Sequence, residues 1–227
     1  KKKLLFQIKK VKKFNMEIIT IPVTAFAQNS RIIWCSETKH AVVIDPGGDT
    51  DKIITVLNEH KLALSGIWLT HGHLDHVGGA DILRNQFNVQ IIGPQKDEYF
   101  WFENLPMQAQ MFGFKPIEPF YPDIWLNHND TVSVGKLSFL VKHCPGHTPG
   151  HIVFYQPDYE CVIVGDVIFK GSVGRTDFPK GNSEQLIESI KTHILTLPDN
   201  TKILAGHGSD TTVGFEKKTN PFISGKF

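Results

Sequence analysis

Residues 70–79 read Thr70-His71-Gly72-His73-Leu74-Asp75-His76-Val77-Gly78-Gly79, with three histidines and one aspartate inside six positions. The apolar run just before them predicts a buried strand that ends at the first histidine. In an extended segment the side chains at positions i and i+2 point to the same side, so His71 and His73 can reach one metal ion. Asp75 continues along that side, and His76 lies where the chain turns into a helix. The stretch therefore offers two neighbouring sets of metal ligands.

Three later positions repeat this pattern, each at the end of an apolar strand. Because α/β proteins build sites from residues gathered at strand ends, we expect these side chains to join the first group. Zinc takes nitrogen and oxygen ligands in four or five positions, so seven such side chains suit two ions better than one. An aspartate in the middle of the set can bridge the two ions. The candidate ligands are His71, His73, Asp75, His76, His147, Asp166 and His207.

Short strand-like runs alternate with helical patterns, and strands outnumber helices. Each half is rich in strands first and in helices later, which predicts an α+β fold of two mixed sheets packed together with helices outside. The patterns predict helices over Val77–Phe87 and Ser183–Leu195. Residues 99–121 read as a long loop and contain eight of the 24 aromatic residues. They form either a small core beneath that loop or an apolar wall beside a pocket.

Positive charge gathers at the start of the chain. Seven of the 24 Lys and Arg lie in the first 13 residues, so the formal net charge of +1 becomes −6 for residues 16–227. This excludes a globally basic nucleic-acid binder, and the apolar runs are too short for a transmembrane helix. We expect residues 1–15 to be an upstream or cloning-derived extension, with a membrane-surface or nucleic-acid arm as the alternative. The odd number of cysteines, three, favours a reducing cytoplasm over a disulfide scaffold.

The ligand pattern resembles the metallo-β-lactamase fold superfamily at all seven positions. In having aspartate at position 166, the chain resembles the hydrolase branch of that superfamily. This branch is typified by glyoxalase II, which is hydroxyacylglutathione hydrolase. Three flanking stretches resemble a short, single-domain subset of that branch: Ile44–Gly48, His143–His151 and Gly174–Pro179. The resemblance implies a four-layer αβ/βα sandwich. It also implies that His71, His73 and His147 hold one ion, that Asp75, His76 and His207 hold the other, and that Asp166 bridges them.

The same resemblance gives expectations about the substrate. Arg175 matches a basic family residue that contacts it. Two-domain glyoxalase II enzymes carry a helical C-terminal region that binds glutathione, whereas only 20 residues follow His207 here, and Ser209 stands where the family usually has tyrosine. We therefore expect residues 16–227 to form one domain without that region. Asp45, before Pro46, either supports a ligating histidine from behind or is simply a turn residue.

The expected activity is hydrolysis of a thioester such as S-lactoylglutathione by a metal-bridging hydroxide that the carboxylate of Asp75 orients. We expect two divalent ions, with zinc favoured and iron or manganese as alternatives. The expected partner is a small anionic thioester, with neither nucleic acid nor membrane. Three other functions stay open. They are a persulfide dioxygenase with one iron on His71, His147 and Asp166, a lactone or β-lactam hydrolase, and a non-catalytic module with a structural metal.

Overall fold

The computed structural model describes residues 15–224, so the predicted basic extension lies outside the described residues except for Asn15. The first of its two main sheets is mixed. Its five strands pair in chain order, antiparallel at first and then parallel from the third strand on. The strands are β1 (Met16–Val23), β2 (Gln28–Cys35), β3 (His40–Ile44), β4 (Ala63–Trp68) and β5 (Ile91–Ile92).

The second sheet is also mixed and has six strands in the order β13-β12-β9-β8-β7-β6, in which only β12 and β9 run parallel. A short hairpin, β10 with β11, lies beside it. The strands are β6 (Thr131–Val134), β7 (Leu137–His143), β8 (Ile152–Gln156), β9 (Cys161–Gly165), β10 (Ile168–Phe169), β11 (Ser172–Val173), β12 (Lys202–Ala205) and β13 (Thr211–Thr212).

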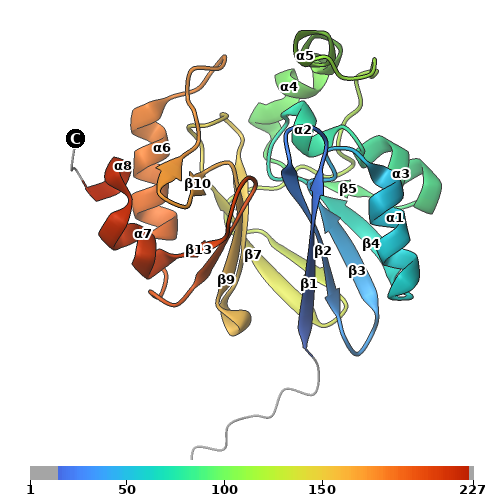
Figure 1. Cartoon of the computed structure of the whole chain (residues 1–227), viewed down its shortest axis with the longest axis horizontal. Helices are drawn as coiled ribbons and strands as arrows, with labels where there is room; N and C mark the ends of the chain where they lie inside the picture. Colours follow the sequence, from blue (N-terminus) through green and yellow to red (C-terminus); the bar gives the residue numbers. More distant parts are fainter. Residues whose placement is uncertain (1–14, 225–227) are drawn as a thin grey trace, which may run out of the picture.

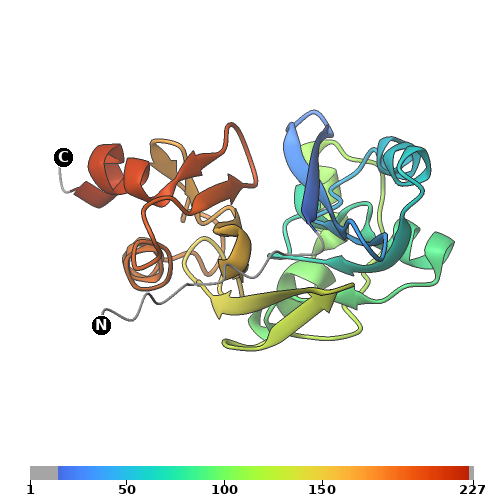
Figure 2. The ribbon, with the colours of Figure 1, turned by 90° about the horizontal axis from the view of Figure 1, so that it is seen from below.

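Helices cover the outer face of each sheet, α1 and α3 on the first and α6 and α7 on the second (Figures 1 and 2). The expected four-layer α+β sandwich is thereby confirmed. Among the described residues, no helix is both long and apolar enough to cross a membrane. The helices are α1 (Thr50–Glu59), α2 (Leu74–Val77), α3 (Ala80–Phe87), α4 (Tyr99–Glu103), α5 (Leu105–Phe112), α6 (Ser183–Ser189), α7 (Val213–Thr219) and α8 (Pro221–Ser224), with short helical turns at η1 (Lys96–Glu98), η2 (Pro157–Tyr159) and η3 (Ile190–Ile194).

Three apolar clusters separate these layers. The middle cluster lies between the sheets, where the Trp68 ring on β4 meets the rings of Phe139 and Phe154, at centroid distances of 5.2 and 5.3 Å. Every residue of β2 is buried, because one of its faces meets the helices and the other meets the second sheet. This packing fixes one sheet against the other, and with it the strand ends that carry the candidate ligands.

Two sequence expectations about helices were wrong in detail. The helix predicted over Val77–Phe87 begins only at Ala80, as α3, and the shorter α2 ends at Val77, with Gly78 and Gly79 between the two helices. A side-chain carbon on Gly79 would come within 2.8 Å of the Pro46 carbonyl oxygen, so the backbone approaches the turn after β3 too closely for any other residue. The predicted helix Ser183–Leu195 is α-helical only to Ser189 and then widens into the π-type turn η3.

Candidate metal centre

The seven candidate ligands meet at one edge of the sandwich. Four of them lie in the loop after β4 and in α2, while His147, Asp166 and His207 follow β7, β9 and β12. The ligand atoms of His71, His73 and His147 lie within 4.8 Å of one another, and so do those of Asp75, His76 and His207. The structure thus brings together every ligand that the sequence predicted, drawn from both sheets.

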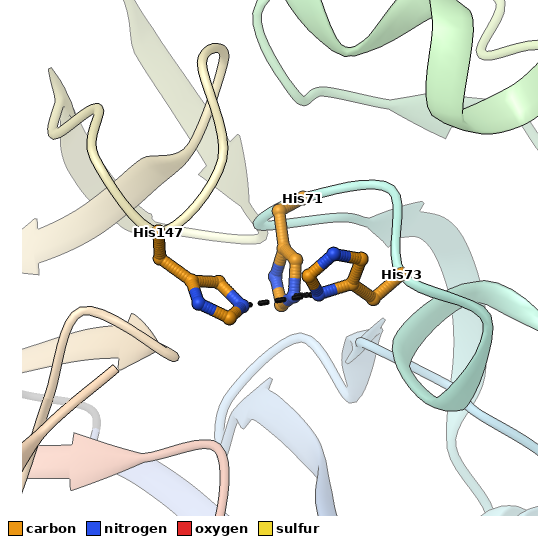
Figure 3. Close-up of side chains that lie close together, drawn as sticks. All are labelled: His71, His73 and His147. Carbon is orange, nitrogen blue, oxygen red and sulfur yellow. Dashed lines mark hydrogen bonds between the residues drawn. The ribbon is translucent and has the colours of Figure 1, made fainter. Parts of the chain in front are cut away.

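Three imidazoles form the first group (Figure 3). Nδ1 of His73 lies 3.1 Å from Nε2 of His71 and 3.0 Å from Nε2 of His147. Burial, followed by the neighbouring histidines, lowers the pKa of His71 and His73 well below the ordinary histidine value. Three neutral nitrogens that converge in this way are a donor set for one divalent cation.

The second group contains the carboxylates. Nε2 of His207 lies 3.1 Å from Oδ2 of Asp75 and 3.6 Å from Oδ2 of Asp166. Nε2 of His76 lies 3.3 Å from Oδ1 of Asp166, and Nε2 of His147 lies 3.7 Å from Oδ2 of the same carboxylate. Asp166 therefore stands between the two groups, as a bridging ligand would.

Two buried atoms test whether a metal ion fits here. Nε2 of His76 and Oδ1 of Asp166 are buried and lie 3.3 Å apart, yet neither meets the geometry of a hydrogen bond with any described residue. Burying polar atoms without partners is costly, and a cation between them removes that cost. A side-chain carbon on Gly206 would come within 2.3 Å of Oδ1 of Asp166, so glycine keeps this space open. The residues present thus fit a divalent ion.

Hydrogen bonds behind the histidines aim them at the site. Nδ1 of His147 donates to the Arg175 carbonyl oxygen at 2.6 Å, and Nδ1 of His207 donates to the Phe26 carbonyl oxygen at 3.2 Å. With Nδ1 occupied, Nε2 of each ring is left with its lone pair directed to the centre. Such outer contacts fix the tautomer and orientation of metal-binding histidines.

Asp45 supports His71 and His76 in the same manner. Its Oδ2 accepts from Nδ1 of His76 at 3.0 Å and from the Thr70 hydroxyl at 2.6 Å, and that hydroxyl lies 3.0 Å from Nδ1 of His71. The backbone of Asp45 is left-handed, with φ of 49°, a conformation that aspartate tolerates better than most residues. Both sequence interpretations of Asp45 therefore describe it, because it is a turn residue whose carboxylate lies behind two candidate ligands.

In the second group, the carboxylates and the imidazoles shift one another's pKa values. Burial favours the neutral ring of His76, but the carboxylates of Asp166 and Asp75 outweigh it and raise the pKa of His76 well above the ordinary value. Burial likewise opposes ionisation of Asp166, but His76 and His147 outweigh it and hold the Asp166 pKa far below its usual range. Asp166 is therefore an anion at neutral pH, which a bridging ligand must be.

Residues on β2 and just before β8 hold the last two ligands in place. Nε2 of His151, a histidine that the sequence placed outside the ligand set, accepts from the backbone N–H of Asp166 at 3.1 Å. The Asn29 amide donates to the carbonyl oxygens of Ala205 and Gly208, on either side of His207. The guanidinium of Arg31 also donates to the Ala205 carbonyl oxygen, at 3.0 Å.

Glu98 is a supporting residue that sequence reasoning missed. Its side chain is fully buried at the end of η1, and its carboxylate accepts from the backbone N–H of Gly72 at 2.8 Å and of Gly150 at 2.7 Å. Gly72 separates two candidate ligands, and Gly150 lies in the loop that carries His147. One carboxylate thus joins the ligand-bearing loops of the two sheets. The available signal was an Asp97-Glu98 pair just before an aromatic run, which by itself does not specify a contact.

Glu98 predicts a pH effect on stability. Burial raises the pKa of Glu98 to about 7, above its unfolded value of about 4.5. The folded state therefore binds more protons between these values, so this carboxyl group lowers stability as pH rises through that window. Between pH 5 and pH 8, we expect the unfolding free energy of the wild type to fall by about 3 kcal/mol more than that of Glu98→Gln. Urea denaturation of both proteins at each pH measures the two changes. A difference between the two proteins that does not change with pH would contradict this.

A cavity of about 590 Å³ opens beside the centre. His73, Asp75, His147, Asp166 and His207 contribute to its lining. Residues 99–121 form both a part of the core and an apolar wall of this cavity, the two alternatives that the sequence offered. The expected loop was wrong in part, because most of the segment from Tyr99 to Phe112 is helical. The Phe102 and Phe120 side chains join the core, whereas other aromatic residues of the segment line the cavity.

Arg175 lines the same cavity, as expected for a substrate contact. Nε and Nη2 of its guanidinium donate to the Asp177 carboxylate, both at 2.6 Å. The guanidinium also lies 4.2 Å from the ring centroid of Phe178. More than half of each charged side chain in this pair is exposed, so the ion pair contributes little stability and a substrate carboxylate can compete for Arg175. The substrate role of Arg175 stays a prediction.

The fold and this cluster of histidines and aspartates define a class of metal-dependent hydrolases. Residues 23–207 match the Metallo-beta-lactamase superfamily, and the chain belongs to that family, whose fold binds divalent metals. It is 49% identical over 212 residues to a Haemophilus influenzae protein named hydroxyacylglutathione hydrolase GloC, covering 93% of this chain and 100% of that one.

Two solved structures are similar as well. The BLEG-1 B3 metallo-beta-lactamase is 35% identical, with a TM-score of 0.85, over 92% of this chain and 100% of that one. TTHA1623, solved in a di-iron-bound form, is 33% identical, with a TM-score of 0.82. The likeness covers 90% of this chain and 99% of that one. These likenesses agree with the four-layer fold and with a centre for divalent metal.

Proposed function

We propose that this protein is a cytoplasmic, metal-dependent thioesterase that hydrolyses S-acylglutathione-type substrates. The observation that carries the proposal is the convergence of five histidines and two aspartates beside a substrate-sized cavity. The similarity to a hydroxyacylglutathione hydrolase supports the choice of a thioester. The three cysteines are buried and free, which agrees with a reducing compartment.

His71, His73 and His147 would hold one ion, and Asp75, His76 and His207 the other, with Asp166 between them. When bound, two divalent ions, for which we favour zinc, activate water at neutral pH and stabilise negative charge on the carbonyl oxygen. The side chains arranged here supply the donors for that chemistry without a serine or cysteine nucleophile. The pKa of the Cys144 thiol is raised by burial, so it stays protonated and inert.

Asp75 is the residue best placed to orient the attacking water. It lines the cavity, whereas Asp45 lies behind the histidines. Burial opposes its ionisation, but His76 and His207 outweigh this and hold the pKa of Asp75 below its usual value. An ionised carboxylate at the cavity wall accepts a hydrogen bond from water and directs its oxygen toward the substrate carbonyl.

Parallel assays separate the proposal from its alternatives. Thiol release from S-lactoylglutathione is measured beside oxygen uptake with glutathione persulfide, and metals are counted in protein purified without added metal. We expect thioester cleavage with no oxygen uptake. A single iron, oxygen uptake and an intact thioester would overturn the proposal in favour of a dioxygenase.

A β-lactam hydrolase is the second candidate, favoured by the likeness to the B3 metallo-beta-lactamase. The same donors act on either acyl group, so the ligand set does not distinguish them. We rank the thioester first because the hydroxyacylglutathione hydrolase is 49% identical to this chain, whereas the lactamase is 35% identical to it. Cleavage of a chromogenic cephalosporin faster than of S-lactoylglutathione would reverse this order.

Arg175→Ala tests substrate recognition within this proposal. An Arg contact to a substrate carboxylate contributes about 1.5–3 kcal/mol, so we expect KM for S-lactoylglutathione to rise about tenfold or more. The kcat should change little, because the guanidinium does not touch the reacting atoms in this role. Lys191→Ala, an exposed charge on η3, serves as the control. An unchanged KM would remove Arg175 from the substrate site.

A further inference from the structure

Much of the cavity is built from apolar side chains. Nine of its 21 lining residues are aromatic or methionine. Among the described residues that line it, Arg175 is the only lysine or arginine. A wall of this composition binds apolar groups well and offers few fixed charges to a polar one.

The apolar wall begins at a candidate ligand and runs outward. The ring of Trp101 lies 4.5 Å from that of His73, and the ring of Phe178 lies 5.1 Å from it. Phe178 in turn packs against Phe112 at 6.3 Å, and Phe112 against Phe26 at 6.0 Å. A group attached to a carbonyl at the metal centre would therefore lie directly on aromatic rings.

The outer part of this wall is exposed to solvent. Met111 is 67% exposed, Met107 57%, Phe26 44% and Phe112 39%. These side chains come from α5 and from the turn between β1 and β2, which are far apart in sequence and face one cavity. A cluster of exposed apolar side chains of this kind marks a binding surface.

We propose that the acyl group of the substrate is large and apolar, an aromatic ring or a chain of about six carbons, and not the small hydroxyacyl group of S-lactoylglutathione. This rests on the proposed thioesterase activity. A lactoyl group leaves the outer wall in contact with water, whereas a larger group covers the aromatic rings and displaces that water. Each added methylene that reaches an apolar pocket contributes about 0.8 kcal/mol, equivalent to about fourfold.

The test compares four glutathione thioesters that differ only in the acyl group: acetyl, lactoyl, hexanoyl and phenylacetyl. We expect kcat/KM for the hexanoyl and phenylacetyl compounds to exceed that for the lactoyl compound at least about tenfold. A profile that is flat, or highest for lactoyl, overturns the proposal. Met111→Asp should lower the ratio of phenylacetyl to acetyl activity, and Ile82→Ser, at an exposed apolar position outside the cavity, should leave that ratio unchanged.

Binding without hydrolysis separates this inference from the proposed activity. S-hexylglutathione and S-methylglutathione are thioethers that the enzyme cannot cleave, and calorimetry gives their Kd values. We expect the hexyl compound to bind at least about tenfold more tightly. If no thioester is cleaved but this preference is found, the proposed reaction fails and the apolar site stands. Equal Kd values overturn the apolar site even if thioesters are cleaved.

Discussion

Asp166→Ala is expected to lose metal and activity together. The Asp166 carboxylate lies between the two ligand groups, within 3.7 Å of three imidazole nitrogens, whereas the Asp75 carboxylate lies that close to only two. Losing a residue that merely supports a metal ligand costs about 10–100-fold in metal affinity or activity, so losing a bridging ligand should cost at least about 100-fold. The metal content per chain should fall by half or more.

Metal analysis after dialysis and thioester hydrolysis measure the two losses. Asp51→Ala, which removes an exposed carboxylate on α1, is the matched control and should keep both. Full metal content in Asp166→Ala would show that this carboxylate is not a ligand. Normal activity at reduced metal content would show that one ion is enough.

Glu98→Ala is expected to be strongly destabilising and to weaken the centre. Removing the carboxylate leaves two buried backbone N–H groups without acceptors, those of Gly72 and Gly150. Each unsatisfied donor costs about 1–3 kcal/mol, which gives about 2–6 kcal/mol in total. That is a large share of the typical stability of a folded domain, about 5–15 kcal/mol. The loops that carry His73 and His147 would also lose their connection, so metal affinity should fall.

Urea denaturation measures the stability loss, and competition with a chelator measures the metal affinity. Asp97→Ala, at the exposed residue next to Glu98, should change stability by less than about 0.5 kcal/mol. Glu98→Gln keeps one acceptor oxygen and should fall between wild type and alanine. A Glu98→Ala protein as stable as Asp97→Ala would show that other groups satisfy these amides.

The candidate ligands could be predicted from sequence because each one is defined locally. His71 and His73 follow an apolar strand at alternating positions, and Asp166 and His207 each follow another such strand. The period of a strand and the position of its end are short-range properties. The arrangement of two sheets with helices outside could be predicted as well, because the alternation of strands and helices is also read from short stretches of sequence.

Contacts between distant segments were not predictable in this way. Glu98 was missed because its partners lie 26 and 52 residues away, and no local pattern marks a buried carboxylate. The segment 99–121 looked like a loop because prolines and a glycine interrupt it. In the structure Pro106 lies in the first turn of α5, where proline is tolerated, and Gly113 ends that helix in a left-handed conformation.

The contacts of Asn29 and Arg31 with the end of β12 and the segment after it also bear on how the chain folds. They join residues that are 174 to 179 positions apart, and Arg31 is only 2% exposed. Contacts of such separation form slowly, because the entropy of closing a long loop must be overcome first. During synthesis, β2 is complete long before its partners at residues 205–210 exist. We therefore expect the position of His207 to be among the last features of the molecule to form, so that the candidate metal centre is completed only at the end of folding.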